Sequence, residues 1–369
     1  MTAQSILATR RKTIAFAFDI DGVLIKGKQP VPGAREALRK LQEQHIPFIF
    51  LTNGGGLTEA AHIRRLELRL GLDFSVKQLV QSHTPFYDLV PLYAKKPVLV
   101  LGGHEQQIRD VAHAYGFEHV LTSSDFFVDY PHIHPFSEMT CVHHSTHGRS
   151  HNERGHGIQG EELKDTRIAA IMVWSSPRDW CLDLQLIKDL LLSERGKVGT
   201  RSTKNGDPSL ENHGYQRDDQ PKLYFSNPDF AWATQHELPR LAQGAFRAAL
   251  EGIWTEETHG RARLEYSIVG KPTNLTYEYA EKALVRHYEH VLSSSAKEAD
   301  IGTVYMVSVL VETGVHVAGT TPMHMPTHLT RDVGEAVDWA LGVNGLGEAE
   351  TKGLDGSLAE VGQNEGMDM

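Results

Sequence analysis

The chain has 369 residues, of which 40% are hydrophobic and 23% charged, and these proportions are typical of a soluble globular protein of about two domains. Its formal net charge of −10 argues against a nucleic-acid-binding protein, which would present a basic face. No apolar run reaches the ~18 residues that a membrane-spanning helix needs, so no integral membrane segment is predicted. Cys141 and Cys181 offer no disulfide framework, which favours a reducing compartment.

The N-terminal segment is basic: its first twelve residues contain Arg10, Arg11 and Lys12 and no acidic residue. Such a segment occurs both at the end of a mitochondrial presequence and in an ordinary N-terminal extension, and the residues leave both interpretations open. The first predicted strand begins directly afterwards, at Thr13.

That strand is an apolar run from Thr13 to Phe18, predicted to be fully buried, and it leads into Asp19 and Asp21. Alternation along the strand places both carboxylates on one side, and Gly22 then allows a sharp turn. The carboxyl ends of parallel strands are where open α/β sheets bind ligands, and two neighbouring carboxylates need a shared cation or proton. Taken alone, the stretch is also compatible with a plain strand followed by an Asp-Gly turn.

Three further elements follow in alternating order. Apolar spacing predicts a helix over Ala34–Gln44, a second buried strand over Pro47–Leu51, and a helix that Thr58 caps and that extends to about Leu70. The β-α-β-α order predicts a parallel sheet with right-handed crossovers, and therefore an α/β fold.

The loop after the second strand consists of Thr52, Asn53 and three glycines that begin at Gly54. Successive backbone N–H groups just before a helix N-terminus bind phosphate and similar anions. The loop therefore predicts a phosphate site next to Asp19 and Asp21. A flexible glycine loop without a ligand is the alternative.

From about Ser82 the composition changes, and a second α/β module is predicted, inserted into the first. Its expected strands are Pro97–Leu101, Ile168–Val173 and Lys222–Phe225, and its expected helices are His104–Tyr115, Leu182–Ser193 and Gly244–Leu250. The polar, glycine-rich stretches Phe136–Lys164 and Gly196–Asp219 are predicted to be surface loops.

Seven histidines fall between His132 and His156. Three of them, His143, His147 and His151, are four residues apart, and on a helix they would share a face that could hold a metal. Because several glycines interrupt this segment, a solvated loop is the prediction, with metal binding as the alternative.

The chain then predicts a return to the first module through a strand over Leu264–Val269, followed by Gly270-Lys271-Pro272 and a helix over Tyr277–Val291. A lysine at such a strand end can neutralise phosphoryl oxygens, although a lone lysine is more often a surface residue. A strand over Thr303–Val311 and a closing helix over Arg331–Leu341 are the last predicted elements.

The order Asp19-x-Asp21-Gly, Thr52-Asn53 and Gly270-Lys271-Pro272 resembles the haloacid dehalogenase superfamily. More narrowly, the chain is similar to subfamily IIA and to the cat-eye-syndrome critical-region protein five family, with its fungal relatives. The supporting segments are Phe50–Gly56, Ser82–Phe86, Pro177–Leu184, Tyr224–Asp229, Gln243–Arg247, Val309–Val315 and Arg331–Ala336. The resemblance implies a Rossmann-like core over 12–82 and 262–343, an inserted α/β (C2-type) cap over 83–261, and a disordered acidic tail over 344–369.

The resemblance also implies a Mg²⁺-dependent phosphohydrolase of a small phosphorylated metabolite. Asp19 would attack phosphorus and form an aspartyl phosphate, and Asp21 would protonate the leaving oxygen and then activate water. Both aspartates would bind Mg²⁺. Thr52, Asn53 and Gly54 would bind the phosphoryl group, and Lys271 would neutralise its charge. Residues Ser226–Asp229 of the cap would cover the site.

One family motif is missing: the fourth, which lies between two strands and carries the last metal-binding acids. In this chain the strand before that motif continues directly into the strand after it. No acid lies between Asp300 and Glu312. Two neighbouring parallel strands need a crossover of about a dozen residues, so Thr303–Val311 either fits one strand position or forms a single long strand. Two explanations are open: the sheet lacks a strand and its covering helix, or the segment was removed from this gene product. Weak metal binding and impaired activity are therefore expected. Glu312 as a substitute ligand is disfavoured, because its family position is on the following strand.

Two functional hypotheses remain open. The first is a phosphatase of this family whose activity is impaired, and the second is an inactive protein that binds a phosphorylated ligand or a protein partner. The resemblance further implies a mitochondrial location, with the cytoplasm as the alternative, and a link to glycerophospholipid metabolism. A homo-oligomer is left open.

Overall fold

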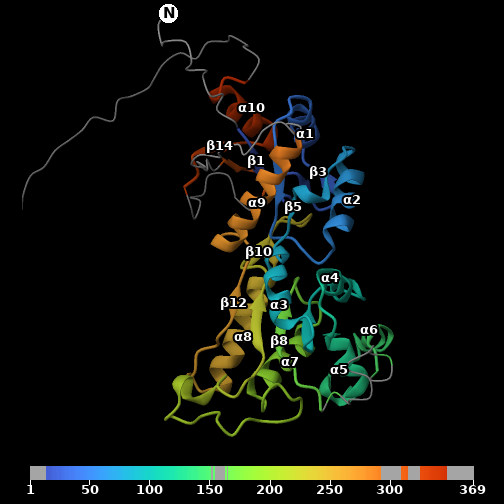
Figure 1. Ribbon diagram of the computed structural model, residues 1–369, viewed down its shortest axis with the longest axis vertical. Helices are drawn as coiled ribbons and strands as arrows, with labels where there is room; N and C mark the ends of the chain where they lie inside the picture. The colour runs from blue at the N-terminus through green and yellow to red at the C-terminus, as the bar shows by residue number, and fades with distance from the viewer. Residues whose placement is uncertain are drawn as a thin grey trace, which may run out of the picture.

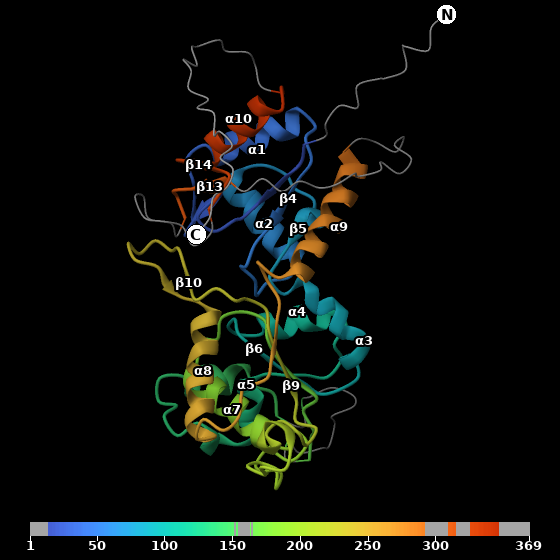
Figure 2. The ribbon, with the colours of Figure 1, turned by 90° about the vertical axis from the view of Figure 1, so that its left-hand side faces the viewer.

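The computed structural model describes residues 14–150, 153, 163, 165–291, 309–314 and 325–346. Two lobes follow one another along the long axis of the molecule (Figures 1 and 2). The first lobe contains both ends of the described chain, and the second is built from its middle. No helix in the described ranges has the length and apolar character that crossing a bilayer requires.

A parallel three-stranded sheet organises the first lobe, in the order β1-β4-β5. Its strands are β1 (Phe16–Phe18), β4 (Phe48–Leu51) and β5 (Leu79–Val80). The helices α1 (Ala34–Glu43), α2 (Glu59–Leu70) and α9 (Asn274–Val291) belong to the same lobe. As predicted, Thr58 caps α2 by accepting a hydrogen bond from the backbone N–H of Ala61, so the helix begins directly after the glycine loop.

The prediction that the first strand is fully buried is wrong. Phe18 is buried, but Ala15 and Ala17 are exposed. β1 is hydrogen-bonded to β4 on one side, and no strand among the described residues is bonded to its other edge. An apolar run indicates a strand, but the number of neighbours that cover it depends on chain segments far away in the sequence.

The predicted strand over Thr303–Val311 is described only in part, because residues 301–308 lie outside the described ranges. Residues Val309–Val311 form β13, which pairs in parallel with β14 (His328–Thr330) in a separate sheet. The Thr313 hydroxyl donates to the carbonyl oxygen of Gly22 at 2.5 Å, so this pair is attached to the turn after β1. α10 (Val333–Val343), capped by Asp332, follows β14. Most of the predicted tail, residues 347–369, lies outside the described ranges.

The second lobe contains a parallel five-stranded sheet in the order β12-β9-β8-β6-β7. Large apolar side chains such as Trp174 and Trp254 are buried in this lobe. The strands are β6 (Val98–Leu101), β7 (Val120–Leu121), β8 (Ala170–Val173), β9 (Lys222–Phe225) and β12 (Ser267–Ile268). The helices are α3 (Val90–Tyr93), α4 (Gln107–Tyr115), α5 (Ser123–Asp129), α6 (Cys141–His147), α7 (Trp180–Leu192) and α8 (Gln243–Glu257). The predicted class, a Rossmann-like parallel α/β core with an α/β cap, is confirmed.

The strand predicted over Leu264–Val269 is shorter than expected and pairs with β9, so it belongs to the second sheet. The chain therefore passes back to the first lobe between β12 and α9, through residues 269–273. The domain boundaries at 82/83 and 261/262 stay predictions.

The histidine-rich segment is not a continuous loop. Residues Cys141–His147 form α6, and Gly148 ends that helix instead of interrupting it. His143 and His147 lie near each other on α6, with ring centroids 4.8 Å apart, whereas His151 lies outside the described ranges. The predicted loop is therefore wrong for the first half of the segment.

Two β-hairpins meet between the lobes. One is formed by β2 (Ile25–Lys26) and β3 (Gln29–Pro30), and the other by β10 (Ala231–Trp232) and β11 (Arg240–Leu241). At their tips the Gln235 side chain packs so closely on Gly27 that a Cβ there would lie 2.3 Å from Gln235 Cγ. The second lobe thus reaches over the segment that follows Asp19 and Asp21.

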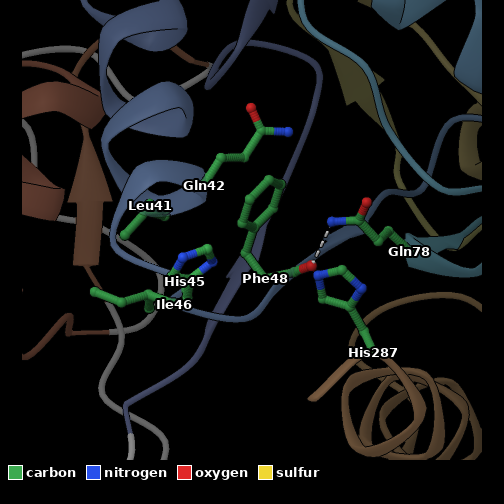
Figure 3. A pocket seen from close by; sticks show the side chains of 7 residues that line it. All are labelled: Leu41, Gln42, His45, Ile46, Phe48, Gln78 and His287. Carbon is green, nitrogen blue, oxygen red and sulfur yellow. Dashed lines mark hydrogen bonds between the residues drawn. The ribbon is translucent and has the colours of Figure 1, made fainter. Parts of the chain in front are cut away.

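A depression in the first lobe lies at the amino end of β4, near α1 and α9 (Figure 3). The Gln78 side-chain amide donates to the carbonyl oxygen of Phe48 there, at 2.9 Å. Its lining residues are Leu41, Gln42, His45, Ile46, Phe48, Gln78 and His287. Because ligands of parallel α/β sheets bind at the carboxyl ends of the strands, this depression is on the wrong side for the predicted chemistry.

Candidate active site

Lys271 and Asp19 come together between the carboxyl ends of β1 and β4. The ammonium Nζ of Lys271 lies 2.9 Å from Asp19 Oδ1, and it also donates to the carbonyl oxygen of Leu51 at 2.9 Å. The Asp19 side chain is 40% exposed, so the ion pair contributes little to stability. An accessible carboxylate beside a fixed cation is, however, the arrangement that a nucleophile attacking an anionic group requires.

Asp21 is more deeply buried than Asp19. Burial, with a further contribution from the charge of Asp19, raises its pKa to about 6, although Lys271, Arg69 and Arg65 act in the opposite direction. Gly54 allows the glycine loop after β4 to approach Asp21, because a Cβ at that position would lie 3.1 Å from Asp21 Oδ2. A carboxyl group with this pKa can both release and accept a proton near neutral pH.

The glycine loop, residues 52–57, is held in shape by its own hydrogen bonds and by Gln81. Thr52 is buried, and its hydroxyl oxygen accepts the backbone N–H of Gly54 at 2.9 Å. The Thr52 hydroxyl proton can then be donated to a ligand. Gln81 supports the far end of the loop by donating to the carbonyl oxygen of Leu57 at 2.9 Å, while its own amide oxygen bonds His62.

The side chain of Asn53 is hydrogen-bonded to other residues of the protein. Its Oδ1 accepts the backbone N–H of Lys271 at 2.7 Å, and its Nδ2 donates to the Lys271 carbonyl oxygen and to Asp229 Oδ1, both at 3.0 Å. The Asn227 amide donates to the backbone carbonyl of Asn53 at 2.9 Å. Asn53 therefore fastens the segment between the lobes, and its predicted role as a phosphate ligand stays a prediction.

The second lobe contributes an acid to the site. Burial raises the pKa of Asp229, the charge of Asp19 acts in the same direction, and the Asn53 hydrogen bond and Lys271 oppose the shift. On the other side of the loop, Ser175 of the second lobe lies against Gly56. The predicted segment Ser226–Asp229 thus does lie over the loop that follows β4.

The described residues supply part of a divalent-metal site. Asp19 and Asp21 offer the carboxylate oxygens that hard cations prefer. Among the residues that the structure describes, no third acid or histidine completes a three-ligand set with them. Glu312 is hydrogen-bonded through its backbone N–H to Thr330, and its charge acts on Arg331. Among the described residues, Glu312 does not form a three-ligand group with Asp19 and Asp21.

Sequence reasoning missed two cations near the site. Arg65 and Arg69 lie four residues apart on α2, and both charges act on Asp21. Their spacing on the helix that follows the glycine loop is a signal that was present in the sequence, since residues i and i+4 share a helix face. Together with Lys271 they make the surroundings of Asp21 suited to an anionic ligand.

Replacing Asp21 by asparagine is expected to stabilise the metal-free protein at pH 7.5 by about 1–3 kcal/mol. Because the folded-state pKa of Asp21 lies above its ordinary value of 3.8, the folded chain retains a proton between about pH 4 and pH 6 that the unfolded chain has lost. The stability that this proton gives is present at low pH and is lost as the pH rises through about 6. Thermal unfolding across this range checks the sign: wild type should lose stability relative to Asp21→Asn, whereas Asp73→Asn, an exposed control, should follow wild type.

Replacing Asn53 by alanine is expected to cost about 1–3 kcal/mol, because the backbone N–H of Lys271 and the carboxylate of Asp229 each lose a hydrogen-bond partner. The loss should appear as faster limited proteolysis within residues 226–230 and 269–273. Asn344→Ala, which removes an exposed asparagine at the end of α10, is the matched control. Equal cleavage of the two variants would contradict a fastening role for Asn53.

Comparison with known proteins agrees with this arrangement. A carboxylate pair at the end of β1, a glycine loop after β4 and a lysine between the lobes define a capped hydrolase, and residues 16–118 match the haloacid dehalogenase-like hydrolase family. The chain belongs to that family. A mitochondrial hydrolase of Saccharomyces cerevisiae is 34% identical over 371 residues, which cover 100% of this chain and 93% of the relative.

Two further relatives extend the comparison. A cardiolipin synthase (CMP-forming)/mitochondrial hydrolase fusion protein of Schizosaccharomyces pombe is 34% identical over 361 residues, covering 92% of this chain but only 55% of that protein. Among solved structures, a 4-nitrophenylphosphatase from Thermotoga maritima has a TM-score of 0.50 and 18% identity, with 88% of this chain and 95% of that chain covered. A hypothetical protein from Pyrococcus horikoshii OT3 has a TM-score of 0.50 and 19% identity, covering 89% and 99%. The predicted superfamily is confirmed.

Proposed function

We propose that the chain is a phosphohydrolase that acts on a small phosphorylated metabolite through an aspartyl-phosphate intermediate on Asp19. The observation that carries the proposal is the convergence of an accessible Asp19, the Lys271 ammonium at 2.9 Å and the partly protonated Asp21 beside the glycine loop. This combination provides a nucleophile, a charge for the phosphoryl oxygens and a proton donor within one small region.

In the first step a carboxylate oxygen of Asp19 attacks phosphorus, and the bond from phosphorus to the leaving oxygen breaks as Asp21 gives that oxygen its proton. In the second step Asp21, now ionised, takes a proton from water as the water oxygen attacks the phosphoryl group. Asp19 leaves as a carboxylate, inorganic phosphate is released and Asp21 is protonated again. Thr52 and the backbone of Gly54 would hold the phosphoryl oxygens, and Lys271 would offset their charge.

Members of this family generally use a divalent metal, and we propose Mg²⁺ here, with Asp19 and Asp21 as its ligands. Mg²⁺ would neutralise charge on the phosphoryl group and between the two carboxylates. The absence of a third acidic ligand among the described residues supports weak metal binding and a reduced rate. Each ~1.4 kcal/mol of lost transition-state stabilisation lowers the rate about tenfold.

Names of relatives suggest where the chain works and on what. Two of them are called mitochondrial hydrolases, and one is fused to a cardiolipin synthase, which supports a mitochondrial location and a phosphorylated precursor of glycerophospholipids as substrate. A short match over 69 residues, 44% identical, to the human glycerol-3-phosphate phosphatase points to the same class of compound.

A hydrolysis assay with 4-nitrophenyl phosphate tests the proposal. Phosphate release should depend on added Mg²⁺, and acid-quenched protein should carry a phosphoryl group that hydroxylamine removes, as an acyl phosphate does. Phosphate release without a hydroxylamine-sensitive phosphoprotein would contradict the covalent mechanism.

A second candidate function is favoured by the lack of a third acidic ligand among the described residues: a protein that binds a phosphorylated ligand without hydrolysing it. Lys271, Arg65 and Arg69 would still attract an anion in that case. Protection from thermal unfolding by inorganic phosphate, together with no phosphate release above the buffer rate, would support this alternative over the enzyme.

A further inference from the structure

Away from the candidate active site, three side chains of the second lobe converge on one point. The Nε2 atoms of His134 and His144 lie 2.9 Å and 3.1 Å from the same carboxylate oxygen, Oδ2 of Asp179. The ligand atoms of the three residues all lie within 4.8 Å of one another. His134 follows α5, His144 lies on α6 and Asp179 caps α7, so the cluster joins the region of α5 and α6 to the start of α7.

The cluster is shielded from water. The side chains of His134 and His144 are 2% and 4% exposed, and that of Asp179 is 11% exposed. Asp183, one turn further along α7, is also buried, and its Oδ1 has no hydrogen-bond partner in the described part of the chain. Within those same ranges, no lysine or arginine forms an ion pair with either carboxylate. A cation bound by Asp179 and the two imidazoles would balance the carboxylate charge in this poorly hydrated region.

The surroundings fix the orientation of Asp179 and His144, whereas Nδ1 of His134 is buried and has no hydrogen-bond partner within the described part of the chain. Asp179 Oδ1 accepts the backbone N–H of Leu182 at 3.1 Å, which turns Oδ2 toward the histidines. The Ser124 hydroxyl lies 2.9 Å from Nδ1 of His144, so the other ring nitrogen of this histidine is held by a neighbour. Thr140 donates its hydroxyl proton to Asp179 Oδ2 at 2.7 Å. Supporting hydrogen bonds of this kind are typical around metal-binding histidines and carboxylates.

We propose that His134, His144 and Asp179 form a structural site for Zn²⁺ in the second lobe. Two imidazole nitrogens and one carboxylate oxygen are a donor set that zinc accepts and that Mg²⁺ does not prefer. In a tetrahedral zinc site with ligand distances of ~2.0–2.2 Å, neighbouring ligand atoms are about 3.4 Å apart. The two separations from Asp179 Oδ2, 2.9 Å and 3.1 Å, would widen by a few tenths of an ångström. The ligand nitrogens of the two histidines lie within 4.8 Å of each other and would take up the tetrahedral spacing on binding, with a water molecule as the fourth ligand.

The metal would tie the outer part of the lobe to the active-site region. Asp179 follows β8 and the segment that contains Ser175, and Ser175 lies against Gly56 of the glycine loop. A cross-link through Asp179 would therefore restrict both α6 and the segment that touches the loop. Figure 1 shows α5, α6 and α7 in the lower part of the second lobe, away from the first lobe.

Zinc titration of the purified full chain tests the site, with Mg²⁺ in excess so that the hard oxygen ligands of Asp19 and Asp21 are not available. Wild type should bind one equivalent of Zn²⁺, should gain thermal stability from it, and should give the visible spectrum of a tetrahedral centre when Co²⁺ replaces Zn²⁺. His143→Ala, the neighbouring histidine on the same helix, is the matched control and should behave as wild type. His144→Ala should bind less than a tenth as much metal.

Asp179→Asn provides a second variant in case His144→Ala does not fold, because an amide oxygen can still cap α7. It should fold as wild type and lose the Co²⁺ spectrum. If His144→Ala still binds the metal and His143→Ala does not, the proposal is overturned, and the metal binds the surface pair His143–His147 instead. No zinc binding by wild type would also overturn it and leave a hydrogen-bonded cluster only. None of these readouts depends on phosphatase activity.

Discussion

Asp19→Asn is expected to lower phosphate release from 4-nitrophenyl phosphate by about a thousandfold or more, because an amide cannot form the covalent intermediate. The amide has nearly the size of the carboxylate, and the Asp19 side chain is partly exposed, so the fold should be retained. The measurement is the steady-state rate with Mg²⁺, accompanied by the hydroxylamine-sensitive phosphoprotein, which should disappear from the variant.

The control for this experiment is Asp73→Asn, an exposed aspartate of the same lobe. It should retain the wild-type rate. If wild type and Asp19→Asn hydrolyse the substrate equally fast, the chain is not an enzyme of this mechanism, and the ligand-binding alternative gains support.

Lys271→Met is expected to lower kcat/KM about a hundredfold, the size of effect seen when one fixed donor to a developing charge is removed. The ammonium lies 2.9 Å from Asp19 and contributes to lowering the pKa of Asp21. Its loss should therefore also move the part of the pH–rate profile that reports Asp21 to a pH above about 6. The full profile of kcat/KM measures both effects in one experiment.

Lys26→Met is the matched control, since Lys26 is exposed on β2 in the same lobe. A purely structural role for Lys271 would lower the fraction of folded protein without shifting the pH profile of the remainder. An unchanged profile with a reduced rate would therefore contradict the electrostatic role of the lysine.

The chemical centre could be predicted from the sequence because its parts follow local rules. An apolar run that ends on Asp19 and Asp21, and glycines before a helix that Thr58 caps, are patterns contained in a few neighbouring residues. The structure places these parts as expected, with Gly54 against Asp21 and Lys271 against Asp19.

The features that could not be predicted, such as the role of Asn53 and the burial of β1, depend on contacts between residues that are distant in the sequence. Nothing near Asn53 in the sequence indicates that its side chain bonds Lys271 and Asp229, because those partners are 218 and 176 residues away. The burial of β1 was overestimated for the same reason, since the composition of a strand does not reveal what lies on its other edge.

The histidines show what periodicity can and cannot predict. A spacing of four identifies residues that share a helix face, and His143 and His147 do share one. It does not identify which face is buried. His144, outside the regular series, is the residue that faces the interior and meets Asp179, which is 35 residues further along the chain.

The position of Lys271 between β12 and α9 gives the molecule a mechanical property. Lys271, whose ammonium contacts Asp19, lies in one of the two chain segments that connect the lobes. Asn53 bonds both the backbone N–H and the carbonyl oxygen of Lys271. Because Asp19, Leu51 and Asn53 all belong to the first lobe, Lys271 is held on that lobe by both its side chain and its backbone. Loss of the Asn53 hydrogen bonds should therefore also loosen the ammonium that lies beside Asp19, at the point where the chain passes between the lobes.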